Sequence, residues 1–358
     1  MEKYIYEILI EEFHTDEKVR QIYNKSELLQ YFNLKSNAIH GSVKTRRSLA
    51  NWYALYGILH FYKESNFTNN KQMYLNFEGF PYTKLFNFMR TLYGGEKLQN
   101  HALNSRVNGE FANKIASNPD KNIILINEGK YMIHPDYIYV DAIDLSDIYI
   151  KVVEKYISLL IEKDRGLLST IEELKNEKNI DKKKMIISEL LKVDSEARVF
   201  EIVAYAVLAN YYSKTKVFIG YTKDELKEYY LQLYKTGRTN ANDGGIDFVM
   251  KPLGRFFQVT ESGNYNKYFL DIDKVLKFPI TFVVKTNLSK EVILSELMDH
   301  AEIQSGGIKA IKKSYIEAIE DVITINELKK WIVNITEKDA EKIAEDIELY
   351  YKLELNIE

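Results

Sequence analysis

Two short apolar stretches with polar ends decide the fold of this chain: Gly244-Gly245-Ile246-Asp247-Phe248-Val249-Met250 and Phe256-Phe257-Gln258-Val259-Thr260-Glu261. The residues between them, 251–255, contain a proline and a glycine, a composition that is typical of turns. The sequence therefore predicts strands over 246–250 and 256–260. Successive side chains of a strand point to opposite faces, so Gln258 and Thr260 are expected on one face. If the strands pair as a hairpin, Asp247 lies beside them.

This hairpin offers ligands for a divalent cation. A carboxylate, an amide oxygen and a hydroxyl at one end of a sheet are hard oxygen donors, which suit Mg²⁺. The two glycines before the first strand would let a substrate backbone approach closely. A further carboxylate, Glu201, is predicted on a helix over 195–212, at the border of its apolar stripe. An ionised carboxylate there is costly unless it is paired or bound to a metal, so Glu201 joins Asp247 and Gln258 as a candidate metal ligand.

The surrounding pattern indicates an α/β domain (α+β overall). Apolar runs predict further strands at 216–220 and 280–285. A helix is predicted over 222–234, and helices complete the chain. Helix, strands and a helix-flanked strand in this order indicate a layered domain that combines a sheet with helices.

The arrangement resembles the PD-(D/E)xK nuclease core and, within it, type II restriction endonucleases. The resemblance covers roughly residues 195–290, about a quarter of the chain. It implies a helix–three-strand–helix–strand catalytic core. It also implies Mg²⁺-dependent hydrolysis of phosphodiester bonds in double-stranded DNA, which leaves 5′-phosphate ends. A companion DNA methyltransferase that acts on the same site is implied as well.

By position, the four catalytic residues of the family fall on Glu201, Asp247, Gln258 and Thr260, and the first three would be the metal ligands. Gln258 replaces an acidic ligand but still supplies an oxygen. Thr260 replaces a lysine that is thought to orient the attacking water, and this is the larger departure from the family pattern. The residues that remain as alternatives for that role are Lys251, Lys285 and Glu261.

The region before the predicted core is mainly helical. Helices are predicted over much of 17–64 and around 83–93, and residues 122–134 alternate as a strand pair with a turn at 127–130. Helices followed by a hairpin suggest a winged-helix-like DNA-recognition domain. A strongly charged run after residue 172 places the domain boundary near 185. The predicted domains are therefore 1–185 for DNA recognition and 186–358 for catalysis.

Composition limits the partners. The net charge is −3, so the molecule as a whole does not attract nucleic acid, and any DNA contact must come from local basic patches. The candidate DNA contacts are the basic and amide side chains of three polar segments: Lys35, Asn37, His40, Lys44, Arg46, Arg47, Asn104, Arg106, Arg238 and Asn240.

Other features of the sequence indicate which chemistry, compartment and oligomeric state to expect. There is no cysteine, which excludes disulfides and thiolate chemistry. No apolar run approaches the length of a membrane span and no secretory signal is visible, so we expect a cytoplasmic protein. Palindromic DNA sites usually require two-fold symmetry, and on that ground we expect a homodimer.

Three functional hypotheses stay open at this stage. The first is a sequence-specific endonuclease, the second a non-cleaving DNA-binding regulator, and the third a repair-type nuclease. Residues 217–222 resemble half of a GIY-YIG nuclease signature, but a predicted helix stands where the other half should lie, so we reject that class. The structural alternative for Glu201 is an ordinary ion pair with Arg198. For the basic segment 35–47, the alternative is an exposed loop.

Overall fold

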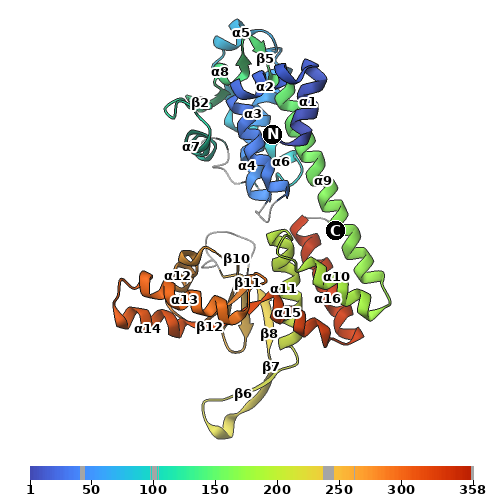
Figure 1. Cartoon of the computed structure of the whole chain (residues 1–358), viewed down its shortest axis with the longest axis vertical. Helices are drawn as coiled ribbons and strands as arrows, with labels where there is room; N and C mark the ends of the chain where they lie inside the picture. The colour runs from blue at the N-terminus through green and yellow to red at the C-terminus, as the bar shows by residue number, and fades with distance from the viewer. Residues whose placement is uncertain are drawn as a thin grey trace. The chain divides into compact units, whose positions relative to one another are not determined.

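The computed structural model describes residues 1–40, 45–96, 98, 103, 105–236, 246–261 and 263–355. The chain divides into two compact units, Met1–Gly166 and Leu167–Glu358 (Figure 1). The division lies within helix α9 (Ser146–Asn176), whereas the boundary predicted near 185 falls inside helix α10 (Ile180–Leu190). The charged run that suggested this boundary forms the mostly exposed sides of these two helices.

The first unit is mainly helical with small antiparallel sheets. Its helices before α9 are α1 (Lys3–Phe13), α2 (Asp16–Lys25), α3 (Glu27–His40), α4 (Thr45–Glu64), α5 (Lys71–Leu75), α6 (Tyr82–Thr91), α7 (Ser105–Lys114) and α8 (Pro135–Ile138). Its strands are β1 (Phe80–Pro81), β2 (Ile124–Asn127), β3 (Lys130–Ile133), β4 (Tyr139–Val140) and β5 (Ile143–Asp144). Strands β2 and β3 form the hairpin predicted at 122–134, and β1 adds to it in the order β1-β3-β2.

Aromatic side chains dominate the core of this unit. The ring of Trp52 on α4 stacks between Phe32, at a centroid distance of 4.8 Å, and Tyr156, at 4.2 Å. All three rings are buried. Stacked rings of this size remove a large apolar area from water, so this sandwich ties α3, α4 and α9 together.

The second unit is built on one five-stranded sheet. Its helices after α10 are α11 (Ala197–Tyr212), α12 (Tyr265–Lys274), α13 (Lys290–Gln304), α14 (Lys309–Ala318), α15 (Ile325–Val333) and α16 (Glu337–Leu355). Its strands are β6 (Lys216–Ile219), β7 (Lys227–Tyr230), β8 (Gln232–Lys235), β9 (Phe248–Lys251), β10 (Arg255–Glu261), β11 (Ile280–Lys285) and β12 (Ile319–Thr324). The sheet order is β12-β11-β10-β9-β8, and β6 and β7 form a separate two-stranded sheet. Strands β8, β9 and β10 are antiparallel neighbours, whereas β10, β11 and β12 run parallel.

Helices cover both faces of this sheet (Figure 1). Phe257 and Val259 of β10 pack in one core with α11, α15 and α16. Phe256 packs in a second core, on the other face, with α12, α13 and α14. The alternation of the strand thus assigns each β10 side chain to one of these two layers.

The α/β class and the strands predicted around 246–250, 256–260 and 280–285 are confirmed. The helix predicted over 222–234 is wrong, because most of this segment forms β7 and β8. The first pairs with β6 in a hairpin and the second with β9, and these ladders outweigh local helix preference. Among the described residues, no helix combines the length and apolar character needed to cross a membrane.

Candidate functional site

Glu201 is the buried carboxylate at the centre of the site. It lies in the second turn of α11 and is 4% exposed. Nη1 of Arg198 lies 2.7 and 2.8 Å from its two oxygens, and Nζ of Lys235 lies 2.9 Å from Oε1. Two cations therefore compensate for the burial of one carboxylate. The pair with Arg198 is the structural alternative that the sequence offered for Glu201.

Lys235 is a site residue that the sequence did not indicate. It is the last residue of β8, at the edge of the sheet, and its Nζ also lies 5.7 Å from the ring centre of Tyr205. The helix predicted over 222–234 hid the strand that brings Lys235 beside α11. A strand prediction would have placed a lysine at the end of the sheet.

Asp247 directly precedes β9 and is fixed by the neighbouring strand. Its Oδ2 accepts a hydrogen bond of 2.8 Å from the backbone N–H of Val259 on β10. Burial alone would lower the pKa of Arg198, but the charges of Glu201, Glu354 and Asp247 outweigh it and raise that pKa above its usual value. Two predicted site residues, Glu201 on a helix and Asp247 at the start of a strand, therefore both act on the guanidinium of Arg198.

Gln258 and Thr260 lie on one face of β10, and both are buried. This is the face of Phe256, covered by α12, where Thr260 is hydrogen-bonded to Tyr268. Glu201 belongs to α11, which covers the opposite face. Thr260 therefore has a structural partner in the core. Thr260, which occupies the position of the family's lysine, therefore does not point toward α11.

The side-chain oxygen of Gln258 is unsatisfied. Its Oε1 is buried and has no hydrogen-bond partner in the described part of the chain, while its Nε2 donates to the carbonyl of Val259 at 3.3 Å. A buried acceptor without a partner is costly, so it suits a ligand that supplies a positive charge or a donor. Continuing the pairing of Phe248 with Phe257 by one residue sets Asp247 level with Gln258 on the adjacent strand.

The three residues that the sequence offered for the role of the family's lysine, Lys251, Lys285 and Glu261, lie at different places in the sheet. Lys251 ends β9 far along the strand from Asp247, with its Nζ 4.9 Å from the ring centre of Tyr234. Lys285 and Glu261 are instead register partners on β11 and β10, with Nζ and Oε1 3.4 Å apart. Lys285 is 3% exposed and also donates to the carbonyl of Ser195, just before α11.

Lys285 has a lowered pKa and lies on the side of the sheet that α11 covers. Its strand neighbour two residues back, Val283, packs in the core with α11, and alternation gives Lys285 the same face. Burial lowers the pKa of Lys285, and the nearby carboxylate of Glu261 offsets part of that effect. Lysines whose pKa is lowered in this way are candidates for proton transfer.

The donors here fit a hard divalent cation in part. Asp247 and Gln258 offer a carboxylate and an unsatisfied amide oxygen on neighbouring strands. The oxygens of Glu201 are already bonded to two cations. No group of three or more His, Cys, Asp or Glu side chains able to hold a metal occurs among residues that the structure describes. A cation at this place would therefore depend on Asp247 and Gln258.

The predicted DNA contacts lie in different settings. Lys35 forms an ion pair of 3.0 Å with Glu110 of α7, and its side chain is only 12% exposed. Asn37 and Arg106 are exposed. His40 belongs to α3, and Arg46 and Arg47 belong to α4, but the positions of these three side chains are outside the description. The remaining candidates lie outside the described residues: Lys44, Asn104, Arg238 and Asn240.

The pair of Lys35 and Glu110 belongs to a network that fixes α7. The carboxylate of Glu110 also accepts hydrogen bonds from Tyr31 at 3.2 Å and from Asn51 at 2.5 Å. Tyr31 and Asn51 are buried on α3 and α4. Because the network spans three helices, it holds the inner side of α7 in a defined position and leaves Arg106 on the outer side.

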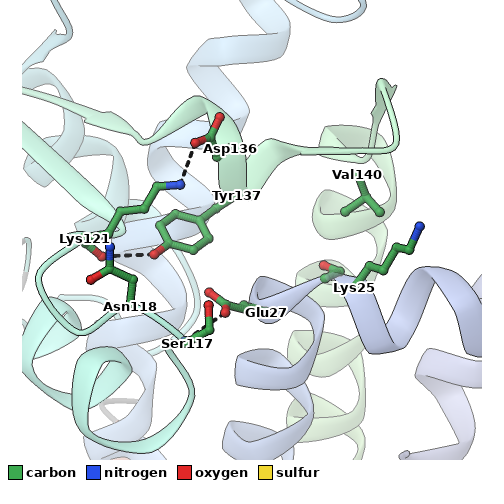
Figure 2. A pocket seen from close by; sticks show the side chains of 9 residues that line it. Lys25, Glu27, Ser117, Asn118, Lys121, Asp136, Tyr137 and Val140 are labelled. Carbon is green, nitrogen blue, oxygen red and sulfur yellow. Dashed lines mark hydrogen bonds and ion pairs between the residues drawn. The ribbon is translucent and has the colours of Figure 1, made fainter.

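The first unit also contains a small pocket of about 250 Å³ (Figure 2). Its polar lining is joined internally. Lys121 pairs with Asp136, Tyr137 donates to the carbonyl of Lys121 at 3.0 Å, and Glu27 accepts from the backbone of Ser117 at 2.8 Å. These contacts join the loop after α7 to α3 and α8.

Comparison with family models, with curated proteins and with solved structures gives no match to this chain.

Proposed function

We propose that this chain is a sequence-specific double-stranded DNA endonuclease of the type II restriction kind, with a PD-(D/E)xK catalytic core. One observation carries the proposal. Apart from the hairpin β6–β7, which is inserted after α11, the elements run in the order α11–β8–β9–β10–α12–β11, and Asp247 at the head of the middle antiparallel strand acts on the same Arg198 as the helix residue Glu201. Without that hairpin, the order matches the helix–three-strand–helix–strand sequence that the resemblance implies for the core.

Asp247 and Gln258 would hold Mg²⁺, whereas Glu201, on the helix that covers the opposite face of β10, would act through Arg198. The bound ion would lower the pKa of a coordinated water and neutralise charge on the scissile phosphate. The protein contributes position: the N–H of Val259 fixes the carboxylate of Asp247, and Arg198 links it electrostatically to α11. In-line attack of water on the phosphate and release of the 3′ oxygen would leave a 5′-phosphate end.

Lys285 is our candidate for the role of the missing lysine. Its ammonium is held by Glu261 and by the carbonyl of Ser195, and burial lowers its pKa. Such a group can orient a water through its N–H donors and exchange a proton with it more readily than an exposed lysine. The proposal thus moves this role from Thr260 on β10 to the next strand.

DNA recognition would belong to the first unit. The order α4–α5–β1–α6–α7–β2–β3, with sheet order β1-β3-β2, supports a winged-helix-like reader in which α7 enters the major groove. Exposed residues of α7, Arg106 and Asn113, would then meet phosphate or base edges. A companion methyltransferase would protect the same DNA site in the host.

A non-cleaving DNA-binding regulator is the second candidate. The observation that favours it is the pairing of Glu201 with both Arg198 and Lys235, since a carboxylate so neutralised resembles a structural ion pair. In a regulator, the first unit would bind DNA in the same way, but the second unit would not cleave it. A repair-type nuclease would share the chemistry of the first candidate without a fixed recognition sequence.

Cleavage of DNA by the purified full chain separates these candidates. Plasmid and genomic DNA are incubated with the protein and Mg²⁺, and Asp247→Asn is compared with Asp299→Asn, a matched change at an exposed aspartate of α13. We expect Asp247→Asn to slow cleavage by about 100-fold or more, because it removes a charge at the reacting centre. DNA binding, measured with Ca²⁺ in place of Mg²⁺, should survive.

The products then decide between the alternatives. Discrete fragments support the restriction enzyme, whereas a smear supports a repair-type nuclease. Intact DNA together with sequence-specific binding by the wild type would overturn the catalytic proposal and leave the regulator. Equal cleavage by Asp247→Asn and wild type would remove this residue from the site.

A further inference from the structure

The second unit carries a projecting hairpin, here called the arm, which comprises residues 216–230. Strands β6 and β7 form it, and a helical turn at Lys223–Glu225 lies near its tip. Figure 1 shows the arm extending away from the five-stranded sheet of its own unit. The strand β7 continues through Leu231 into β8, and Leu231 donates its N–H to the carbonyl of Thr215 at 3.0 Å. The base of the arm is therefore anchored in the sheet.

The arm exposes apolar side chains. Every residue of its two strands is exposed except Val217, which is half-buried. Phe218 is 63% exposed and Tyr230 is 51% exposed, and Tyr221 and Leu226 near the tip are exposed as well. A two-stranded ribbon alone is only marginally stable in water, and a contiguous exposed apolar patch marks an interaction surface.

One face of the arm is self-complementary in charge. Register pairs Phe218 with Glu228 and Lys216 with Tyr230, so these four side chains share a face. That face therefore presents two aromatic rings, one cation and one anion. Lys216 and Glu228 lie 2.8 Å apart within the arm. Over the whole arm, three lysines balance three acidic residues, a composition that does not favour a polyanion such as DNA.

We propose that the arm is a dimerisation element whose partner is a second copy of this chain. In a two-fold contact between the two identical faces, Lys216 meets Glu228 of the partner subunit, and the same pair forms again across the axis. The aromatic rings of the two arms cover one another between these pairs. The inference goes beyond the proposed nuclease and does not depend on it, since it concerns association alone.

Sedimentation of the full-length chain over a range of concentrations tests the proposal. We expect the wild type to dimerise and Phe218→Ser to raise the dimer dissociation constant at least tenfold. Phe278→Ser is the matched control, because Phe278 is 61% exposed but lies outside the arm. It should leave the constant unchanged. Both positions are exposed, and unchanged circular dichroism and melting would establish that each variant folds.

A charge exchange adds a specific readout. Lys216→Glu alone should weaken the dimer, and the double variant Lys216→Glu, Glu228→Lys should restore it, because the exchanged pair forms again across the two-fold axis. A wild type that stays monomeric at all concentrations overturns the proposal. So does a dimer that responds equally to Phe218→Ser and Phe278→Ser. An arm that becomes protected only when duplex DNA is added would assign it to DNA instead.

Discussion

Lys285 and Glu261 face each other across the parallel strands β11 and β10, with Nζ and Oε1 3.4 Å apart. One member of the pair is almost fully buried and the other is half-exposed. The ammonium is thus held at the end of the sheet, beside the backbone that leads into α11. Both residues were candidates for the role of the family's lysine. Their pairing gives the first prediction.

Replacing Lys285 with Met should change how stability depends on pH. Burial lowers the pKa of Lys285 in the folded protein below the 10.5 of a free lysine. Between these two values the unfolded chain binds more protons than the folded one, so wild-type stability rises with pH there. Methionine does not titrate. We therefore expect the free energy of unfolding of the wild type, relative to Lys285→Met, to increase as pH rises through this window.

Urea denaturation of both proteins at a series of alkaline pH values measures this difference. A difference that stays constant with pH would show that Lys285 titrates normally. If Lys285 also serves in catalysis, Lys285→Met should lower the rate of Mg²⁺-dependent DNA cleavage, whereas Lys251→Met should not.

The ion pairs of Glu201 make a prediction about stability. Glu201→Gln leaves Arg198 and Lys235 without their shared carboxylate, so the two cations repel each other. Breaking a fully buried pair costs about 3–5 kcal/mol, and since the side chain of Arg198 is 31% exposed we expect about 2–3 kcal/mol. Glu354→Gln, whose carboxylate lies 3.7 Å from Arg198, should cost less than about 1 kcal/mol. Equal losses in chemical denaturation would contradict this ranking.

Restoring a lysine at position 260 should harm the protein. Thr260→Lys would match the family pattern in sequence, but the side chain is buried under α12 and bonded to Tyr268. Burying an ammonium there is costly, so we expect a loss of about 2–4 kcal/mol and no gain in cleavage. Thr91→Lys, at an exposed position near the end of α6, should be neutral in the same thermal melts. A faster and equally stable Thr260→Lys protein would mean that this position faces the reacting centre.

The surface of α7 makes a prediction about DNA binding. Arg106→Ala should weaken duplex binding on the order of tenfold and reduce its dependence on salt by about one ion, if Arg106 meets a phosphate. Lys313→Ala, an exposed cation of α14, is the control. Fluorescence anisotropy at several salt concentrations measures both effects. The same loss in the two variants would indicate attraction by charge in general.

The sequence predicted the parts of the fold that local patterns determine. Strands β9, β10 and β11 follow from apolar runs around a turn, and α11 follows from its apolar stripe. The strand β8 was not predicted because its partner β9 lies further along the chain, whereas β7 was missed although its partner β6, predicted at 216–220, lies directly before it in a hairpin. Without β8, nothing in the sequence placed Lys235 beside Glu201.

For the candidate site, alternation along β10 predicted that Gln258 and Thr260 share a face. It could not predict which helix covers that face, since this depends on how the chain crosses the sheet. Ion pairs between distant residues could not be predicted either. Lys35 lies in a basic segment, and nothing in that segment indicates that Glu110, 75 residues away, neutralises it.

The continuous backbone from Lys227 to Lys235 belongs to two ladders at once: its first half pairs with β6 and its second half with β9. Lys235, whose ammonium neutralises Glu201, is the last residue of this extended stretch. One run of extended backbone therefore carries both a strand of the projecting hairpin and the lysine that pairs with the buried carboxylate.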